Sequence, residues 1–508
     1  MIKARKKASS FHGSFVLPNG GSVFGEVHLK GPATVLTLKS TSTIDLDLER
    51  RHLHGVSVDN DYVTCVDCIH SSGRHRTQGG VTTFYWDAFP HYVVVGGTHL
   101  DPDAATITNI SFTATDLNTL FYDRQVFGYI ADPRTIMDAV LAEKRKTRSI
   151  EVGRWPQVHY YTGKDTALDL DSAIGNLVVG LNLRTQVGGT TGIQVKSDRR
   201  FLIKPSQPIT FSEAIDRLGI VRRFLSLAAG RPQKITTIRI ITTSEVTQLS
   251  PLEMHWTYAP KGPRGDLNEP QSFDLPFDPI ERPDEFARVL QNWIASDDRM
   301  LVPRARSLMG MQKGNRYDPD RLIAAANMFD LLPPDLCPKD VPLPPEMAEF
   351  KKEAKAKLKA KDFPKTDAQK RALDDMGRWG KASLTDKVLH RWAMASKDVP
   401  RLFENMDYVL KLAVKCRNHF VHGPNKGFAY DRAESFLSLF TDALEFVFVF
   451  ADLVEAGWNP VDWEKRNYSN GHMFARFRWM YPQIAPRLKA AMEAKNQVST
   501  ELQGVGRS

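Results

Sequence analysis

Four side chains near the C-terminus have the types and spacing needed for acid–base chemistry on a phosphodiester. Arg417, Asn418, His419 and His422 lie in the segment KLAVKCRNHFVHGPNKG, residues 411–427. An imidazole exchanges protons near neutral pH, and a guanidinium carries a permanent charge on a planar fork that suits a phosphate group. Cleavage of RNA by its own 2′-hydroxyl needs a proton acceptor and a proton donor of this kind. We therefore interpret this segment as the active site of a ribonuclease.

The element that must position these residues is a predicted amphipathic helix. Apolar residues recur between Pro400 and His422 at alternating spacings of four and three, which predicts one buried helical face: Leu402, Met406, Val409, Ala413, Cys416 and Phe420. Gly423 and Pro424 predict the end of the helix, because glycine tolerates the left-handed cap and proline cannot continue the ladder. His422 therefore lies in the last turn, where the negative end of the helix dipole favours the imidazolium form.

Helical geometry separates two of the candidate residues. Asn418 lies four residues before His422 on the same face, where its amide can orient the imidazole. Arg417 lies five residues before His422, which corresponds to roughly 140° of rotation about the helix axis. Two arrangements would bring both side chains to one phosphate: the last turn unwinds, or two copies of the helix meet across a two-fold axis. We favour the site shared between two copies.

The Arg-to-His spacing alone is weak evidence. With 14 His residues in 508, about one match is expected by chance. Arg154 and His159 in RWPQVH supply such a match, but Trp155, Pro156 and the alternating residues that follow predict strand and turn there. The helical context, and not the spacing, distinguishes the two segments.

The residues around the motif carry a resemblance. CRNHFVHG lies between two long predicted helices and resembles the R-N-x-x-x-H form of the HEPN ribonuclease motif. The whole chain resembles the ApeA family of bacterial anti-phage defence proteins. In the N-terminal half the likeness rests on GSFVLPNGGSVFGEVHL, on LHGVSVDNDYVTCVDC and on the later helix TFSEAIDRLGIVRRFLSLAAGRP. The joint occurrence of these segments, in order over most of the chain, is more specific than any one of them.

The resemblance implies a metal-independent endoribonuclease without a cofactor. His422 would exchange protons with the 2′-hydroxyl or the leaving 5′-oxygen, Arg417 would stabilise the charge on the phosphate, and Asn418 would orient His422. The products would carry 2′,3′-cyclic phosphate and 5′-hydroxyl ends. Basic residues beside the motif are further candidates for substrate binding: Lys415, His419 and Lys426.

The resemblance also implies partners and a biological role. The N-terminal half would sense a phage protein trigger, and the HEPN half would cut host RNA, with tRNA as a candidate, in abortive infection. A homodimer, at least, would form through the HEPN helices. Two alternatives come from other classes of function. One is a non-catalytic HEPN-type module that binds RNA or a partner protein, and the other is a polysaccharide- or protein-binding β module with a helical dimerisation domain.

The composition is that of a soluble globular protein of two or three domains. A chain of 508 residues exceeds one ordinary core, and its 42% hydrophobic and 25% charged residues are typical of globular domains. No run reaches the roughly 18 apolar residues of a membrane span. No apolar segment follows the basic start MIKARKKASSF, so we expect no secretory signal. The four Cys residues fit a reducing cytoplasm, where we expect the protein to act.

The pattern of elements predicts an α+β multidomain protein. Residues 1–280 alternate apolar and polar residues between turn signals, which predicts a mostly antiparallel β domain of sandwich or barrel-like form. We interpret it as the sensing or recognition domain. A helical connector is expected at 281–312, and an all-α HEPN helical bundle at 313–508. One further helix is marked inside the β domain by the capping box Thr210–Glu213 and by the terminator Gly230.

Two helices of the C-terminal part have a plain and a functional interpretation. The helix expected from Asp431 to Ala456 is apolar nearly all round between Phe446 and Val454, so it is either fully buried or half-buried in a partner. We favour a dimer interface. The segment EMAEFKKEAKAKLKAKDF is either a solvated charged helix face or a basic surface that binds the phosphates of an RNA backbone. Residues 341–508 carry a net charge of +7 of the chain's +9, which is modest support for the second interpretation.

Two features of the N-terminal half also allow two interpretations. Cys65 and Cys68, with His70 and His75, could bind zinc, but a strand would point the two Cys to opposite faces unless a turn intervenes. Buried strand cysteines are therefore the favoured interpretation. The segment FYWDAFPHY, expected as a loop, could stack on bases, but such aromatics more often fill a sheet edge or a domain interface.

Overall fold

The computed structural model describes residues 10–17, 20–43, 52–187, 192–243, 251–360, 364–424, 428–466 and 468–494. The chain divides into two compact units. The first, here the β unit, consists of Met1–Pro263 and Pro270–Ala295, and the second, the helical unit, of Arg264–Glu269 and Ser296–Ser508. The region expected as a connector thus contains helix α4 (Pro283–Ala295) of the β unit and helix α5 (Asp297–Gln312) of the helical unit.

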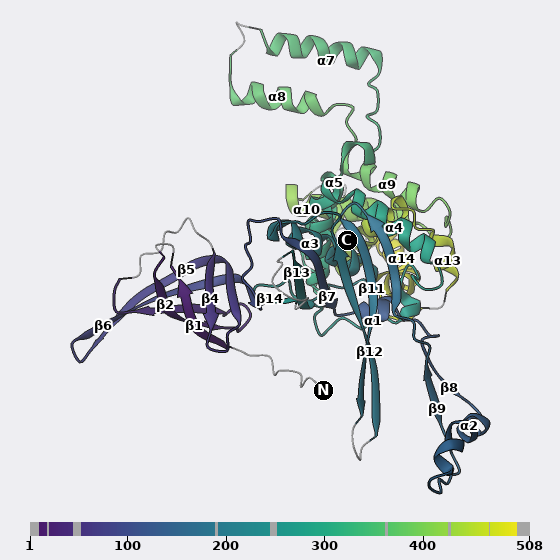
Figure 1. Ribbon diagram of the computed structural model, residues 1–508. Coiled ribbons are helices and arrows are strands. Elements are labelled where there is room, and N and C mark those ends of the chain that lie inside the picture. The colour runs from purple at the N-terminus through teal and green to yellow at the C-terminus, as the bar shows by residue number, and fades with distance from the viewer. Residues whose placement is uncertain are drawn as a thin grey trace, which may run out of the picture. The chain divides into compact units, whose positions relative to one another are not determined.

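Six strands of the β unit close into a barrel (Figure 1). Neighbouring strands are antiparallel in the order β6-β3-β2-β1-β4-β5, and pairing of β5 with β6 completes the ring. The strands are β1 (Ser10–Val16), β2 (Ser22–His28), β3 (Val35–Ser40), β4 (Leu53–Ser57), β5 (Tyr62–Gln78) and β6 (Val81–Gly96). Phe15 fills the interior together with aliphatic residues. At Gly25 and Gly55 an added Cβ would come within 2.4 and 2.7 Å of the Phe15 ring, so these glycines leave the room that the ring needs.

Strand β6 continues from the barrel into a second part of the same sheet. Its residues 84–88 pair with β3 and its residues 92–95 with β14. The order then runs β14-β13-β7-β12-β11-β10, with every pairing antiparallel. The predicted antiparallel β architecture is therefore confirmed, in its barrel-like form for the first six strands. FYWDAFPHY lies inside β6, so the expectation of a loop there is wrong.

The strands of this second part are β7 (Ile107–Ala114), β10 (Thr166–Ser172), β11 (Gly175–Val187), β12 (Ile193–Lys204), β13 (Ile235–Thr242) and β14 (Leu252–Trp256). Three helices pack on it or on one another: α1 (Leu117–Leu120), α3 (Phe211–Ala229) and α4. The predicted capping box is present, because the Thr210 side chain accepts from the Glu213 backbone N–H and the Glu213 carboxylate accepts from the Thr210 N–H. Gly230 ends α3 at φ +67°, as predicted.

A separate arm of the β unit consists of a two-stranded sheet, β8 (Phe127–Ile130) with β9 (Val158–Tyr161), and helix α2 (Arg134–Arg145). None of the α2 side chains is buried. The second Arg-to-His match lies in this arm. His159 is part of β9, and Arg154 lies in a bend before it with its guanidinium 5.1 Å from the Trp155 ring. The predicted strand and turn are confirmed there.

The helical unit is a bundle around α12 (Leu437–Glu455). The other helices are α5, α6 (Pro319–Asp330), α7 (Pro345–Leu358), α8 (Asp367–Arg378), α9 (Leu384–Ala395), α10 (Met406–His422), α11 (Tyr430–Ala433), α13 (Pro460–Lys465) and α14 (Met473–Glu493). The predicted helical bundle is confirmed. Helices α7 and α8 pair with each other (Figure 1). Neither has a buried side chain. No helix in the described ranges is both long and apolar enough to cross a membrane.

Helix α12 is the core of this unit. Each side chain from Leu439 to Leu453 is buried within the chain itself, and α5, α6, α9, α10 and α14 all pack against it. Our expectation that α12 provides a dimer interface is therefore wrong, because its apolar surface is already covered by five helices of the same chain. A dimer of this unit must use other surfaces.

Candidate active site

Helix α10 presents the motif residues at its C-terminal end. Its buried face includes Met406, Val409, Ala413 and Cys416, as the apolar spacing predicts. The helix begins later than expected, because Asn405 has a left-handed backbone (φ +61°) and separates Leu402 from it. At the other end Gly423 has φ +87° and donates its N–H to the His419 carbonyl at 3.0 Å, so the predicted end is confirmed. Because α10 remains α-helical through His422, its last turn is not unwound.

Arg417 is held at the contact between α10 and α6. Its Nη2 donates to Asn327 Oδ1 at 2.9 Å, and its Nη1 donates to Asn418 Oδ1 at 3.1 Å. The Asp330 carboxylate lies 4.0 Å from Nη2 and also pairs with Lys387 Nζ at 3.0 Å. The Arg417 side chain is 15% exposed, and its buried Nε–H has no acceptor among the described residues. The guanidinium is thus oriented while part of its donor capacity is unused.

The other candidate residues have different surroundings. Lys415, Asn418 and His422 are exposed. Among the described residues, the His422 side chain has no hydrogen-bond partner. Asn418 contacts Arg417 through its amide oxygen, so the structure brings these two residues together and leaves the His422 imidazole open to solvent.

His419 lies against aromatic residues rather than facing solvent. Its ring stacks on Tyr430 of α11 with centroids 4.5 Å apart and planes inclined by 8°. It also contacts Phe420 and Phe428. These contacts attach the start of α11 to the end of α10, which is a structural role for His419. Lys426 lies outside the described residues.

Sequence reasoning did not find Asn327. It lies 90 positions before Arg417, on a different helix, and no local pattern indicates which polar residue of α6 faces α10. The spacing of Asn327 and Asp330 by three residues on α6 places both on one helical face. Two polar residues on one face of α6 indicate a contact with Arg417 only when α6 and α10 are known to pack together, as they do here.

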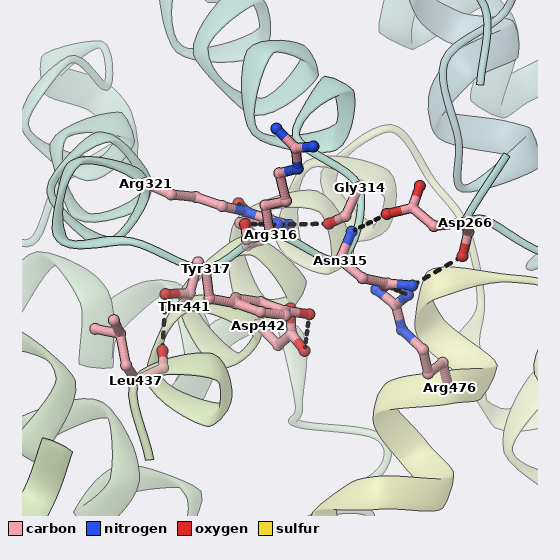
Figure 2. Close-up of polar contacts among 11 residues, drawn as sticks. Asp266, Gly314, Asn315, Arg316, Tyr317, Arg321, Leu437, Thr441, Asp442 and Arg476 are labelled. Carbon is pink, nitrogen blue, oxygen red and sulfur yellow. Dashed lines mark hydrogen bonds and ion pairs between the residues drawn. The ribbon is translucent and has the colours of Figure 1, made fainter. Parts of the chain in front are cut away.

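The start of α6 is fixed by a buried polar network (Figure 2). Arg321 forms a bidentate salt bridge with Glu445 of α12, and both hydrogen bonds measure 2.8 Å. It also donates to the carbonyl oxygens of Gly314 and Arg316. Tyr317 donates its hydroxyl to Asp442, also on α12, at 2.9 Å. Burial raises the pKa of Asp442 to about 6, although nearby arginines oppose the shift. These contacts define where α6 presents Asn327 and Asp330 to Arg417.

Similar contacts hold the segment around Asp266, helix α14 and helix α5. Asn315 donates its side-chain amide to the Asp266 carbonyl at 2.8 Å, and Arg476 of α14 donates to the Asn315 side-chain oxygen at 2.7 Å (Figure 2). In the same bundle, Arg304 of α5 makes a two-point pair with Asp452 of α12 at 3.0 and 2.8 Å. Carboxylates on the central helix therefore hold α5 and α6 in position from inside the bundle.

The Cys pair of β5 does not have the surroundings of a zinc site. Asp67 has φ +51°, and this left-handed residue interrupts the strand alternation between Cys65 and Cys68. A hydrogen bond with Cys68 and burial raise the pKa of the Cys65 thiol well above its usual value. His70 stacks on Trp86 and His75 contacts Phe84. In the described ranges no three His, Cys, Asp or Glu side chains are placed to hold a metal ion.

Comparison with protein families assigns both units. The helical unit has a HEPN fold: the model of the Apea-like HEPN domain matches residues 323–462, a range that includes most of α6 and all of α10 and α12. The model of ApeA N-terminal domain 1 matches residues 10–293, which is more than half of the chain. The chain therefore belongs to the ApeA family, and the resemblance inferred from its sequence is confirmed. No curated protein and no solved structure matches it.

Proposed function

We propose that this ApeA-family protein is an endoribonuclease of bacterial anti-phage defence. Its HEPN domain would cleave host RNA, with tRNA as the candidate substrate, after the β unit binds a phage protein. The observation that carries the proposal is the arrangement on α10. Arg417 is oriented by two amide oxygens, and His422 is exposed in the last turn of a regular helix.

The chemistry needs one proton acceptor, one proton donor and one fixed cation. The 2′-oxygen attacks the adjacent phosphorus as its proton passes to an imidazole, the bond from phosphorus to the 5′-oxygen breaks, and that oxygen receives a proton. Arg417 stabilises the negative charge on the non-bridging phosphate oxygens during this exchange. The products are a 2′,3′-cyclic phosphate and a 5′-hydroxyl, so no water is consumed in the cleavage step.

A site shared by two copies of α10 fits this geometry. Arg417 contacts α6, while five residues of regular helix rotate His422 by roughly 140° from it. In a symmetric dimer, Arg417 of one copy can approach His422 of the other, because a two-fold axis brings the same surface of both copies together. The exposed residues of α10 are available for such a contact, whereas α12 is not.

The test is to sequence RNA ends that carry a cyclic phosphate after phage challenge of cells producing the wild type, Arg417→Ala or His422→Ala. New ends should appear with the wild type and be absent with both variants. Arg154→Ala and His159→Ala are matched controls, since they have the same residue types and spacing in a strand and bend. These controls should cleave like the wild type. Full protection by folded Arg417→Ala and His422→Ala, without new ends, would instead support a non-catalytic binding module.

A further inference from the structure

Outside the HEPN domain, the barrel surface presents cations and aromatic rings in alternation. The strand register places Arg74 of β5 beside Tyr85 of β6, Tyr85 beside Lys39 of β3, and Lys39 beside Phe24 of β2. Directly paired residues point to the same face of a sheet, so these four side chains form one row. We call it the cation–aromatic row.

The side chains of this row contact one another in cation–π geometry. The Arg74 guanidinium carbon lies 5.0 Å from the Tyr85 ring centroid, and Lys39 Nζ lies 5.8 Å from that of Phe24. The row is accessible: the side chain of Arg74 is 63% exposed, and Phe24 is 49% exposed. The Phe24 ring is therefore available to a ligand rather than to the barrel core, and the Tyr85 ring is half-buried.

The end of the β5–β6 hairpin is basic in sequence. Between Asp67 and Asp87 the sequence contains two Arg and two His residues and no Asp or Glu. Asp87 is buried, accepts from Thr37 and Ser72, and lies 3.9 Å from Arg74. Lys39 lies 3.9 Å from Glu26. Both ion pairs are long and both cations are exposed to solvent, so the two cations stay available to an anionic ligand.

The other face of the same hairpin is also aromatic, although Trp86 there packs against the barrel core. His70 stacks on Trp86 with centroids 5.3 Å apart, and His75 contacts Phe84 at 6.1 Å. An added Cβ at Gly73, the residue paired with Trp86, would lie 4.0 Å from the Tyr85 carbonyl oxygen, so the space beside this strand is open. Beyond Phe84 the hairpin has no pairing with β3, and Figure 1 shows it extending past the barrel.

From the cation–aromatic row and the acid-free hairpin we infer that this surface binds single-stranded nucleic acid. Rings on a sheet surface stack on unpaired bases, and interspersed Arg and Lys residues pair with the phosphates between them. A duplex hides its base faces, so it would use the cations but not the rings. An acidic peptide would likewise use the charge alone. The inference does not depend on the nuclease proposal, since it concerns another unit of the chain.

The experiment measures binding of fluorescein-labelled 15-mers of thymidylate and uridylate to the full chain by anisotropy at several salt concentrations. The DNA oligomer lacks the 2′-hydroxyl and is not cut by the proposed chemistry. Tyr85→Leu should weaken binding roughly 5- to 150-fold, which is the range for one base stacked on one ring. Tyr85→Phe keeps the ring and should bind like the wild type. Arg74→Ala should lower the slope of log affinity against log salt by about 1.

One matched control locates the binding. Lys144→Ala removes an exposed charge from α2 and should bind the DNA oligomer like the wild type. Wild-type binding by both Tyr85→Leu and Arg74→Ala would overturn the inference. Equal competition by duplex DNA or by a 15-residue polyglutamate would overturn it too, because either would show charge attraction without stacking. If the DNA oligomer binds as expected and Arg417→Ala still cleaves RNA, the nuclease proposal alone fails.

Discussion

A site built from two copies of α10 predicts that two inactive variants restore each other. In Arg417→Ala one copy lacks the guanidinium, and in His422→Ala the other lacks the imidazole. In their heterodimer one composite site loses both groups, and the second retains Arg417 from one chain and His422 from the other. A site within one chain would be defective in both copies of the same heterodimer.

The magnitude follows from counting composite sites in a symmetric dimer. A purified heterodimer of the two variants should have about half the wild-type cleavage rate, because one of its two sites is intact. Random mixing of equal amounts should give about a quarter, since half of the dimers are mixed. Each variant homodimer should be inactive. The geometric basis is the regular helix through His422, which keeps it roughly 140° from Arg417.

The assay uses two differently tagged chains, tandem purification of the heterodimer, and release of cyclic-phosphate ends from total RNA in extract of phage-infected cells. A wild-type chain paired with a chain carrying both substitutions is the decisive control. The shared site predicts no cleavage by this pair, whereas a site within one chain predicts half of the wild-type rate. Half-activity in this control, together with an inactive Arg417→Ala and His422→Ala pair, would refute the shared site.

Three further predictions concern the interior. Arg321→Met should cost about 3–5 kcal/mol in urea unfolding because it leaves Glu445 buried without its cation, and adding Glu445→Met should recover part of that loss; additive costs would contradict the pairing. The raised pKa of Asp442 favours its protonated form in the fold, so wild-type stability should fall relative to Asp442→Asn by up to about 3 kcal/mol between pH 4 and pH 7. A pH-independent difference would show that Asp442 does not titrate there. Gly13→Ala should lower the melting temperature, since its Cβ would lie 2.0 Å from the Val56 carbonyl oxygen; an unchanged melting curve would contradict the close approach of β1 to β4.

Local signals were sufficient where the deciding interaction is local. Thr210, Glu213 and Gly230 are close in sequence to the helix ends that they determine, and α3 begins and ends as predicted. The same holds for the end of α10 at Gly423. The start of α10 was misplaced because the apolar residues before it suggest one more helical turn. Phe403 is buried, but Asn405 in its left-handed conformation separates it from the helix.

Nonlocal pairing explains the errors in the β unit. Asp87 and Pro90 are residues typical of a loop, yet they belong to a strand that changes partners. On one edge, β6 pairs first with β3 and then with β14, and Pro90 lies between these two stretches. The hydrogen-bond ladder of that edge is interrupted there, so a residue without an N–H is tolerated. The prediction from sequence could not include this, because β14 lies more than 150 residues further along the chain.

The central helix shows why an apolar pattern does not distinguish a core from an interface. Both require a helix that is apolar nearly all round, and only the number of neighbouring helices decides between them. The sequence does contain a distinguishing signal in Glu445 and Asp452. A buried carboxylate needs a fixed cation, and in α12 these two are matched by Arg321 and Arg304 of the same chain. Intrachain partners for every interrupting charge therefore favour a core helix, and the exposed side of α10 is the surface on which we propose that a second copy completes the site.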